Sequence, residues 1–402
     1  MAEGEDFARS QAELRAELVA KAAALVPFLR AQAPRAEEAR RLPEETLAAL
    51  DEAGLFRLRT PGAYGGYEAD VRTYLDVVAE LGRGCSSAAW ITFISCATVW
   101  VVCGFPEAVQ REIFAANPDT RFIGVLAPTA TSKKVDDGYI VRGKWAYASG
   151  CLHAHWALLA TPLQKADDTF EPGIVLAPMT DLSIDDTWYF AACRGTGSNT
   201  VVADDIFVPA RFAMPLSTLL ARNALGDATQ PITYREAFAA SATIMVAAPV
   251  LGMARAALEL TVERVNAGSK RIAYSTYGDI RQSPGMQFEL AEAASLIGAA
   301  NTLVTSWCDR IAAGARNGQE LPFAERARMR VDLGLAMRHC RDGVDRLLSV
   351  QGASAFADAN PMQRIWRDIE FASRHGLLAA EVPLEILGRA LMDDFPMLSP
   401  MV

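Results

Sequence analysis

The stretch KWAYASGCLHAHW, residues 144–156, gathers side chains that can do chemistry: a serine hydroxyl, aromatic rings and two histidines. Aromatic and small residues alternate along it and helical periodicity is weak, so we predict a strand. Small residues at alternate positions let a flat ligand lie against the backbone, while Ser149 offers a hydroxyl and Tyr147 an aromatic wall. This pattern predicts a seat for a planar ring, although a serine at a strand end is also a common turn former.

His153 and His155 stand two residues apart, so they would project from the same face of such a strand. A zinc site needs three or four protein ligands. Neither a carboxylate nor a third histidine stands near in the sequence. We therefore expect no metal.

Composition points to a globular protein with a small organic ligand. The 402 residues are 51% apolar and carry a net charge of −9, which argues against nucleic acid or anionic lipid as the main partner. The seven cysteines are an odd number without CxxC spacing, which indicates buried, reduced thiols. The N-terminal residues lack the apolar segment of a signal peptide, so we expect a cytoplasmic location.

Two uncharged runs, residues 84–106 and 237–254, approach the length of a membrane span. The first contains several serines and threonines, and the second contains Pro249 and many alanines. We therefore expect helices buried within the protein rather than membrane spans.

The chain divides into three zones, which we assign to domains at residues 1–120, 121–230 and 231–402. The first is helical, with a helix start at Pro43 and a stop at Gly54. The second has roughly six strand-like segments separated by turn residues. The third has long helical segments, at 232–267, 284–315, 323–350 and 363–391. Helix, sheet, helix in this order predicts the α+β class.

Three motifs in this order carry a resemblance to a known family. They are RLPEETLAALDEAGLFRLRTPGAYGGYEAD (41–70), RGTGSNTVVADDIFVPARFAM (194–214) and QGASAFADANPMQRIWRDIE (351–370). The chain resembles the acyl-CoA dehydrogenase superfamily over nearly its whole length. That resemblance implies an N-terminal helical domain, a middle β-barrel or sandwich domain and a C-terminal four-helix bundle.

The superfamily includes dehydrogenases, which need a carboxylate to remove the α-proton of an acyl thioester. Gly376 stands at about the place of the common catalytic glutamate, and residues 237–258 hold no Asp or Glu at the alternative place. His375 stands there instead. This pattern, with the Tyr-Ala-Ser-Gly turn before a histidine and a tryptophan, resembles the flavin-dependent monooxygenase branch, the oxygenase components of two-component aromatic hydroxylases.

The resemblance implies reduced FMN or FAD supplied by a separate reductase, O2, a C4a-hydroperoxyflavin and an aromatic, polycyclic or amine substrate. Two alternatives stay open: an acyl-CoA dehydrogenase with a displaced base, and a non-catalytic relative that only binds. A homotetramer is implied as well, because part of the flavin site comes from a second subunit.

The resemblance also implies roles for individual residues. Ser149 would hydrogen-bond flavin N5, and His375 would take a phenol proton or stabilise charge on the oxygen. Ala97 stands near where the family's oxygenases carry a histidine, so the substrate need not be a simple phenol. Trp90 and Phe93 have helical spacing and fit a plain core as well as a pocket wall. The expected cofactor contacts are Pro128, Thr129, Thr131, Tyr147, Ala148, Ser149, Arg271, Gln351 and Gly352, and the expected substrate contacts are Trp90, Phe93 and His153.

Overall fold

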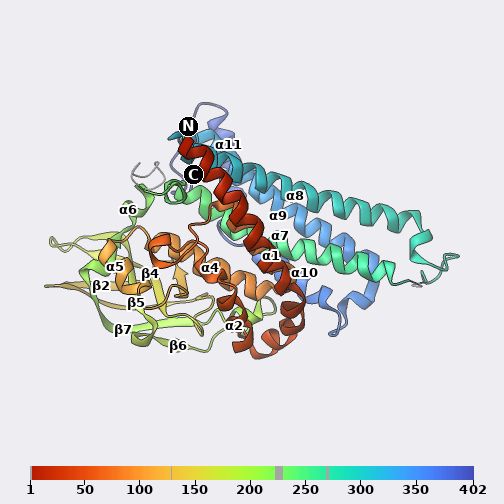
Figure 1. The fold of residues 1–402 in the computed structure, drawn as a ribbon, viewed down its shortest axis with the longest axis horizontal. Coiled ribbons are helices and arrows are strands. Elements are labelled where there is room, and N and C mark those ends of the chain that lie inside the picture. Colours follow the sequence, from red (N-terminus) through yellow and green to blue (C-terminus); the bar gives the residue numbers. More distant parts are fainter. Residues whose placement is uncertain (1, 128, 222–229, 269–270) are drawn as a thin grey trace.

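The computed structural model describes residues 2–127, 129–221, 230–268 and 271–402 (Figure 1). Its first part is helical. The α-helices there are α1 (Ala2–Ala39), α2 (Glu44–Glu52), α3 (Val71–Gly84), α4 (Ser86–Val102) and α5 (Glu107–Phe114). As predicted, α2 begins after Pro43, and Gly54 follows its end with a φ of 72° that glycine adopts without strain.

The middle part forms two four-stranded sheets. One has the order β1 (Phe122–Val125), β4 (Trp156–Gln164), β5 (Phe170–Pro178) and β8 (Ala213–Pro215). The other has the order β2 (Ala130–Val135), β3 (Gly138–Trp145), β7 (Thr200–Pro209) and β6 (Ser183–Asp185). The estimate of six strands was too low because β6 and β8 have three residues each, too short to show an alternating pattern.

The two sheets pack face to face through the inward residues of their strands. Val141 and Val201 on one sheet and Leu159 and Ile174 on the other are fully buried in a shared core. The indole of Trp145 crosses between the sheets and donates to the carbonyl of Ala160 at 2.9 Å. This is the packing expected of a β-sandwich.

The predicted strand over residues 144–156 is wrong. β3 ends at Trp145 and β4 begins at Trp156, and the residues between them form turns. Tyr147 and Gly150 have φ angles of 60° and 82°, far from the negative φ of regular strand backbone. His153 and His155 therefore do not share a strand face.

The last part of the chain is a bundle of helices. They are α7 (Phe238–Asn266), α8 (Pro284–Asn317), α9 (Phe323–Gln351), α10 (Pro361–Ala372) and α11 (Glu381–Ala390), with the short α6 (Leu216–Leu220) before them. The segment predicted as one helix at 363–391 is thus two helices, because the chain turns at residues 373–380. That break holds His375.

The bundle lies beside the sandwich, and α4 runs between them (Figure 1). Both uncharged runs are buried helices as predicted: nearly all of α4 is buried, and 83% of the apolar window of α7 lies inside the protein. α3 and α7 approach closely at two glycines. A Cβ on Gly252 would lie 2.1 Å from the carbonyl oxygen of Ala79, so only glycine fits at this crossing.

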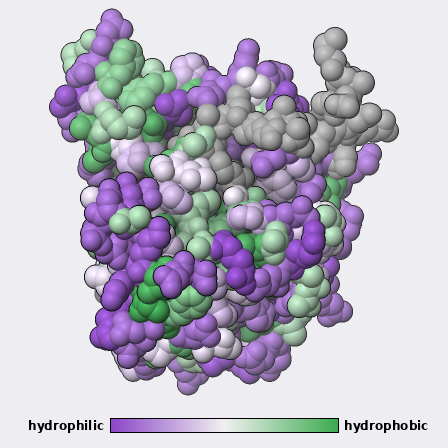
Figure 2. All heavy atoms as spheres, turned by 90° about the vertical axis from the view of Figure 1, so that its left-hand side faces the viewer, coloured by the Kyte–Doolittle hydropathy of each residue, from purple (hydrophilic) through white to green (hydrophobic). Residues whose placement is uncertain are grey.

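The α+β class and the order of helices, sheets and helices are as predicted. Figure 2 shows the side of the molecule on which the sheets lie, where hydrophilic residues predominate and apolar ones are scattered between them.

Candidate active site

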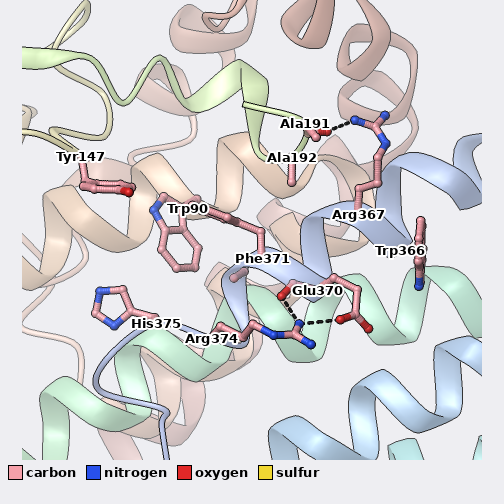
Figure 3. Close-up of a pocket in the computed structure, with 11 residues that line it drawn as sticks. Trp90, Tyr147, Ala191, Ala192, Trp366, Arg367, Glu370, Phe371, Arg374 and His375 are labelled. Carbon is pink, nitrogen blue, oxygen red and sulfur yellow. Dashed lines mark hydrogen bonds and ion pairs between the residues drawn. The ribbon is translucent and has the colours of Figure 1, made fainter. Parts of the chain in front are cut away.

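A cavity of about 700 Å³ opens where the sheet region meets α4 and α10 (Figure 3). Cavities of this size are typical of small-molecule sites. The lining residues are Trp90, Tyr147, Ala191, Ala192, Trp366, Arg367, Glu370, Phe371, Ala372, Arg374 and His375. Of the predicted site residues, Trp90, Tyr147 and His375 thus meet at one cavity.

Tyr147 belongs to a turn that is held against a second turn before β7. The N–H of Ala148 donates to the carbonyl of Asn199 at 3.1 Å, and the N–H of Gly150 donates to that of Thr196 at 2.9 Å. Gly150 has a φ of 82°, which glycine adopts without strain, and a Cβ there would lie 3.3 Å from Ile91 of α4. The motifs YASG and RGTGSN therefore form one structural unit beside the cavity.

Ser149 lies within this unit and is only 7% exposed. It does not itself line the cavity, but it contacts Trp90, which does. Its Oγ accepts a hydrogen bond from Nε1 of Trp90 at 3.2 Å and lies 2.6 Å from Oγ of Ser198. Oγ of Ser198 lies 2.6 Å from Oγ1 of Thr196, which donates to the carbonyl of Cys193 at 2.7 Å. Our sequence analysis missed Ser198 and Thr196, although the RGTGSN motif was the signal that contained them.

An aromatic cluster backs the cavity and was also missed. Trp188 and Phe190 stack with their ring centroids 4.0 Å apart, and the ring of Tyr147 meets Phe190 edge-on at 5.7 Å. Phe371 of α10 meets Trp188 edge-on at 5.8 Å. Such edge contacts between rings from distant segments fix the orientation of Tyr147 at the cavity wall.

His375 lies just after α10, with its ring facing the cavity and 5.9 Å from the ring of Trp90 (Figure 3). Its Nδ1 accepts a hydrogen bond from the N–H of Leu377 at 3.2 Å. Burial, with a smaller effect from the charge of Arg330, lowers the pKa of His375 to about 4. The imidazole is therefore neutral at neutral pH, and its proton must sit on Nε2. In this form Nε2 donates a hydrogen bond and does not accept a proton.

Charged side chains form one rim of the cavity. Glu370 lines it but pairs with Arg374, and both lie on the far side of Phe371 from His375 and Tyr147 (Figure 3). Arg367 pairs with Glu37 of α1 and donates to the carbonyl of Ala191. The pair with Arg374 leaves the carboxylate of Glu370 engaged by a guanidinium.

Asp368 joins α10 to the second turn and to α4. Its buried carboxylate accepts hydrogen bonds from the N–H of Cys193, at 2.6 Å, and from the hydroxyl of Ser86. Burial raises the pKa of this carboxyl. Asp368 thereby sets the position of the helix that carries the lining residues.

Other predicted contacts in the described part of the chain do not line the cavity. Thr129 and Thr131 are exposed near the β2–β3 edge and donate to carbonyls of β3, while Pro128 falls outside the described residues. Phe93 packs edge-on against Trp90 at 5.2 Å, on the same helix. His153 is buried near Arg121 and does not line the cavity, and burial lowers its pKa to about 4.

Arg271, Gln351 and Gly352 lie at the opposite end of the bundle. Arg271 is exposed just beyond the end of α7. The amide of Gln351 is buried, where it donates to Thr261 near that end of α7 and accepts from Asn360. The connections after α7 and after α9 lie at the end of the bundle away from the sheets (Figure 1).

Two family models match this chain and cover more than half of it. Residues 10–115 match the acyl-CoA dehydrogenase N-terminal domain. Residues 244–379 match the acyl-CoA dehydrogenase C-terminal domain.

Curated relatives cover nearly the whole chain. The flavin-dependent monooxygenase oxygenase subunit HsaA of Rhodococcus jostii is 34% identical over 356 residues, 88% of this chain and 92% of that protein. The FADH(2)-dependent resorcinol hydroxylase oxygenase component of a Rhizobium species is 29% identical over 95% of this chain and 96% of its own.

A solved structure is also similar along the whole length. XiaF from Streptomyces, in complex with FADH2 and glycerol, has a TM-score of 0.94 and 33% identity, and the match covers 98% of this chain and 99% of that one.

Proposed function

Because this chain belongs to the acyl-CoA dehydrogenase superfamily and, within it, to the oxygenase components of flavin-dependent monooxygenases, we propose that it hydroxylates an aromatic or polycyclic small molecule. Such a component is an oxidoreductase that works with a separate flavin reductase. A bound reduced flavin would supply the two electrons that activate dioxygen, so that one oxygen atom of dioxygen enters the substrate and the other leaves as water. An amine is the other substrate class that we consider.

The residues around the cavity fit a flavin. Tyr147 presents an exposed ring at the cavity wall, beside the small and buried Ala148. Ser149 presents a hydroxyl at the same turn, where a flavin N5 can meet it. FADH2 in the Streptomyces relative favours FAD over FMN. Thr129 and Thr131, which are exposed and donate to carbonyls of β3 just before the turn, are our candidates for contacts farther along the cofactor.

The observation that carries the proposal is the absence of a usable base beside Ser149. Among the described lining residues, the carboxylate is that of Glu370, and it is neutralised by Arg374. The group that faces Tyr147 is the neutral imidazole of His375, which donates through Nε2. An acyl-CoA dehydrogenase needs a carboxylate at this place, whereas an oxygenase needs a hydrogen-bond donor toward oxygen.

The cavity also favours a class of substrate. Trp90, Trp366 and Phe371 give it broad aromatic walls, which suit flat aromatic rings. His375 donates into it, so a substrate with a phenolic or carbonyl oxygen near the oxygenated atom fits best. Phe93 acts in this proposal by supporting Trp90.

We further propose a cytoplasmic homotetramer. Arg271 and the turn at Gln351–Gly352 do not line the cavity beside Tyr147, and in this proposal they serve the flavin of a neighbouring subunit. Because the side chain of Gln351 is occupied inside the protein, its backbone and that of Gly352 would make this contact.

The test supplies reduced FAD or FMN to the purified protein without air, then adds isotopically labelled dioxygen and a panel of phenols, indoles and polycyclic aromatics. We expect label in the product of at least one class. The proposal is contradicted if every compound gives hydrogen peroxide as the sole oxygen product and if this peroxide forms as fast as it does from free reduced flavin in buffer. Anaerobic bleaching of bound FAD by an acyl-CoA would instead support the dehydrogenase alternative.

A further inference from the structure

We propose that Ser198 and Thr196 fix the direction of the hydrogen bond that Ser149 makes to the flavin, so that the site discriminates in favour of the reduced cofactor. This inference rests on the proposed function, in which Ser149 meets flavin N5. It adds two positioning residues that do not touch the cofactor.

The direction follows from the two ends of the hydroxyl chain. The indole Nε1–H of Trp90 can only donate, and the carbonyl of Cys193 can only accept. Between them stand the hydroxyls of Ser149, Ser198 and Thr196, all of them nearly buried, with oxygen-to-oxygen distances of 2.6 Å.

Each of these three hydroxyls has one proton, which must be assigned to a hydrogen bond. One arrangement uses all of them without a ligand: Ser149 donates to Ser198, Ser198 donates to Thr196, and Thr196 donates to the carbonyl of Cys193. The proton of Ser149 is then occupied. Its remaining lone pair can only accept a hydrogen bond from a ligand.

The reverse direction is less favourable. To donate to a ligand, Ser149 must accept from Ser198, and Ser198 must accept from Thr196. Thr196 then gives up its buried 2.7 Å hydrogen bond to Cys193. A hydrogen bond of this kind corresponds to roughly a three- to tenfold change in an equilibrium constant.

This direction distinguishes the two redox states of the cofactor. Reduced flavin carries a hydrogen on N5, which can donate to Ser149, whereas oxidised flavin has only a lone pair there. Binding of the oxidised form therefore either reverses the chain or leaves two lone pairs facing each other. A dehydrogenase, which begins its cycle with oxidised flavin, has no use for this bias.

The test measures the dissociation constants of oxidised and reduced FAD for the intact protein and for Ser198→Ala. Removing Ser198 frees the proton of Ser149, so the ratio of the oxidised to the reduced constant should fall roughly three- to tenfold. The midpoint potential of bound FAD should become more negative, by about 30 mV for a tenfold change. An unchanged ratio and potential overturn the inference.

Three further variants separate this effect from a general loss of structure. Thr196→Val removes the link to Cys193 and should lower the ratio as Ser198→Ala does, and it serves if that variant fails to fold. Thr196→Ser restores the hydroxyl and should restore the ratio. Thr161→Val removes a buried hydroxyl that does not belong to the row of Ser149, Ser198 and Thr196 and that donates to a carbonyl within the sheets. This control should leave the ratio unchanged.

The outcome also distinguishes this inference from the proposed function. If the unaltered protein binds neither form of FAD or FMN, the proposed function fails. If it binds flavin but Ser198→Ala and Thr196→Val keep the original ratio, only the role of the hydroxyl chain fails.

Discussion

The resemblance suggested two roles for His375, taking a phenol proton or stabilising charge on oxygen, and its surroundings favour the second. Its Nδ1 is occupied by the N–H of Leu377, and its pKa is lowered to about 4 by burial. The ring therefore stays neutral between about pH 5 and 8, with its proton directed into the cavity. In the proposed function it would donate a hydrogen bond to an oxygen that gains negative charge.

We expect His375→Leu to lower the product formed per flavin oxidised by about tenfold or more, because a donor to developing charge is lost. His375→Gln keeps an N–H near the position of Nε2 and should retain most of the yield. Affinity for reduced flavin should change little in either variant. Product and hydrogen peroxide are measured together across the pH range.

The pH profile decides between donor and base. With a pKa of about 4, His375 stays neutral above about pH 5. The product yield of the unaltered protein, plotted against pH, should therefore show no inflection near pH 6.5 that is lost in His375→Gln. An inflection that disappears in this variant would make His375 a base.

Among the secondary-structure elements, α10 carries the largest share of the cavity lining, and Asp368 holds it to the second turn. Asp368→Leu leaves the N–H of Cys193 and the hydroxyl of Ser86 without their acceptor, which costs about 2–4 kcal/mol. Asp368→Asn can accept from Cys193 and donate to Ser86, so its cost should be about 1 kcal/mol.

Urea unfolding of the unaltered protein, Asp368→Leu and Asp368→Asn measures these differences in the free energy of unfolding. Glu325→Gln serves as the control, because it removes an exposed ion pair with Arg310 and should cost less than about 0.5 kcal/mol. Equal midpoints for Asp368→Leu and Asp368→Asn would show that the shared hydrogen bonds do not hold α10.

Local patterns were enough to predict most elements but not the turns that build the site. The helices follow from periodicity and end signals such as Pro43 and Gly54, which act over a few residues. The turn at Tyr147 alternates like a strand in sequence, but its backbone is bonded to residues 196–199. Nothing local encodes that partner.

The same reason explains which site residues were found. Ser149 and His375 stood out through the family resemblance. Ser198, Trp188 and Phe371 become part of the site only because the second turn and α10 pack against the first turn in the folded protein. Their contacts depend on the three-dimensional packing of distant segments, which a single sequence does not display.

For the whole molecule, the separation of Arg271 from Ser149 makes a prediction about assembly. If each flavin uses Ser149 of one chain and Arg271 of another, Ser149→Ala and Arg271→Ala chains should complement each other. Each variant alone should bind reduced flavin weakly. When the two are co-expressed in equal amounts and assemble at random, about a quarter of the sites combine an intact Ser149 with an intact Arg271.

Reduced-flavin binding and product formation should therefore return to roughly a quarter of the original level in the mixed assembly. Mixing the two purified variants without co-expression controls for the contribution of unexchanged oligomers. If both residues served one site within a chain, every site in the mixture would lack one of them and no activity would return. Recovery thus reports directly that the cofactor site spans two subunits, because no single chain in the mixture contains both side chains.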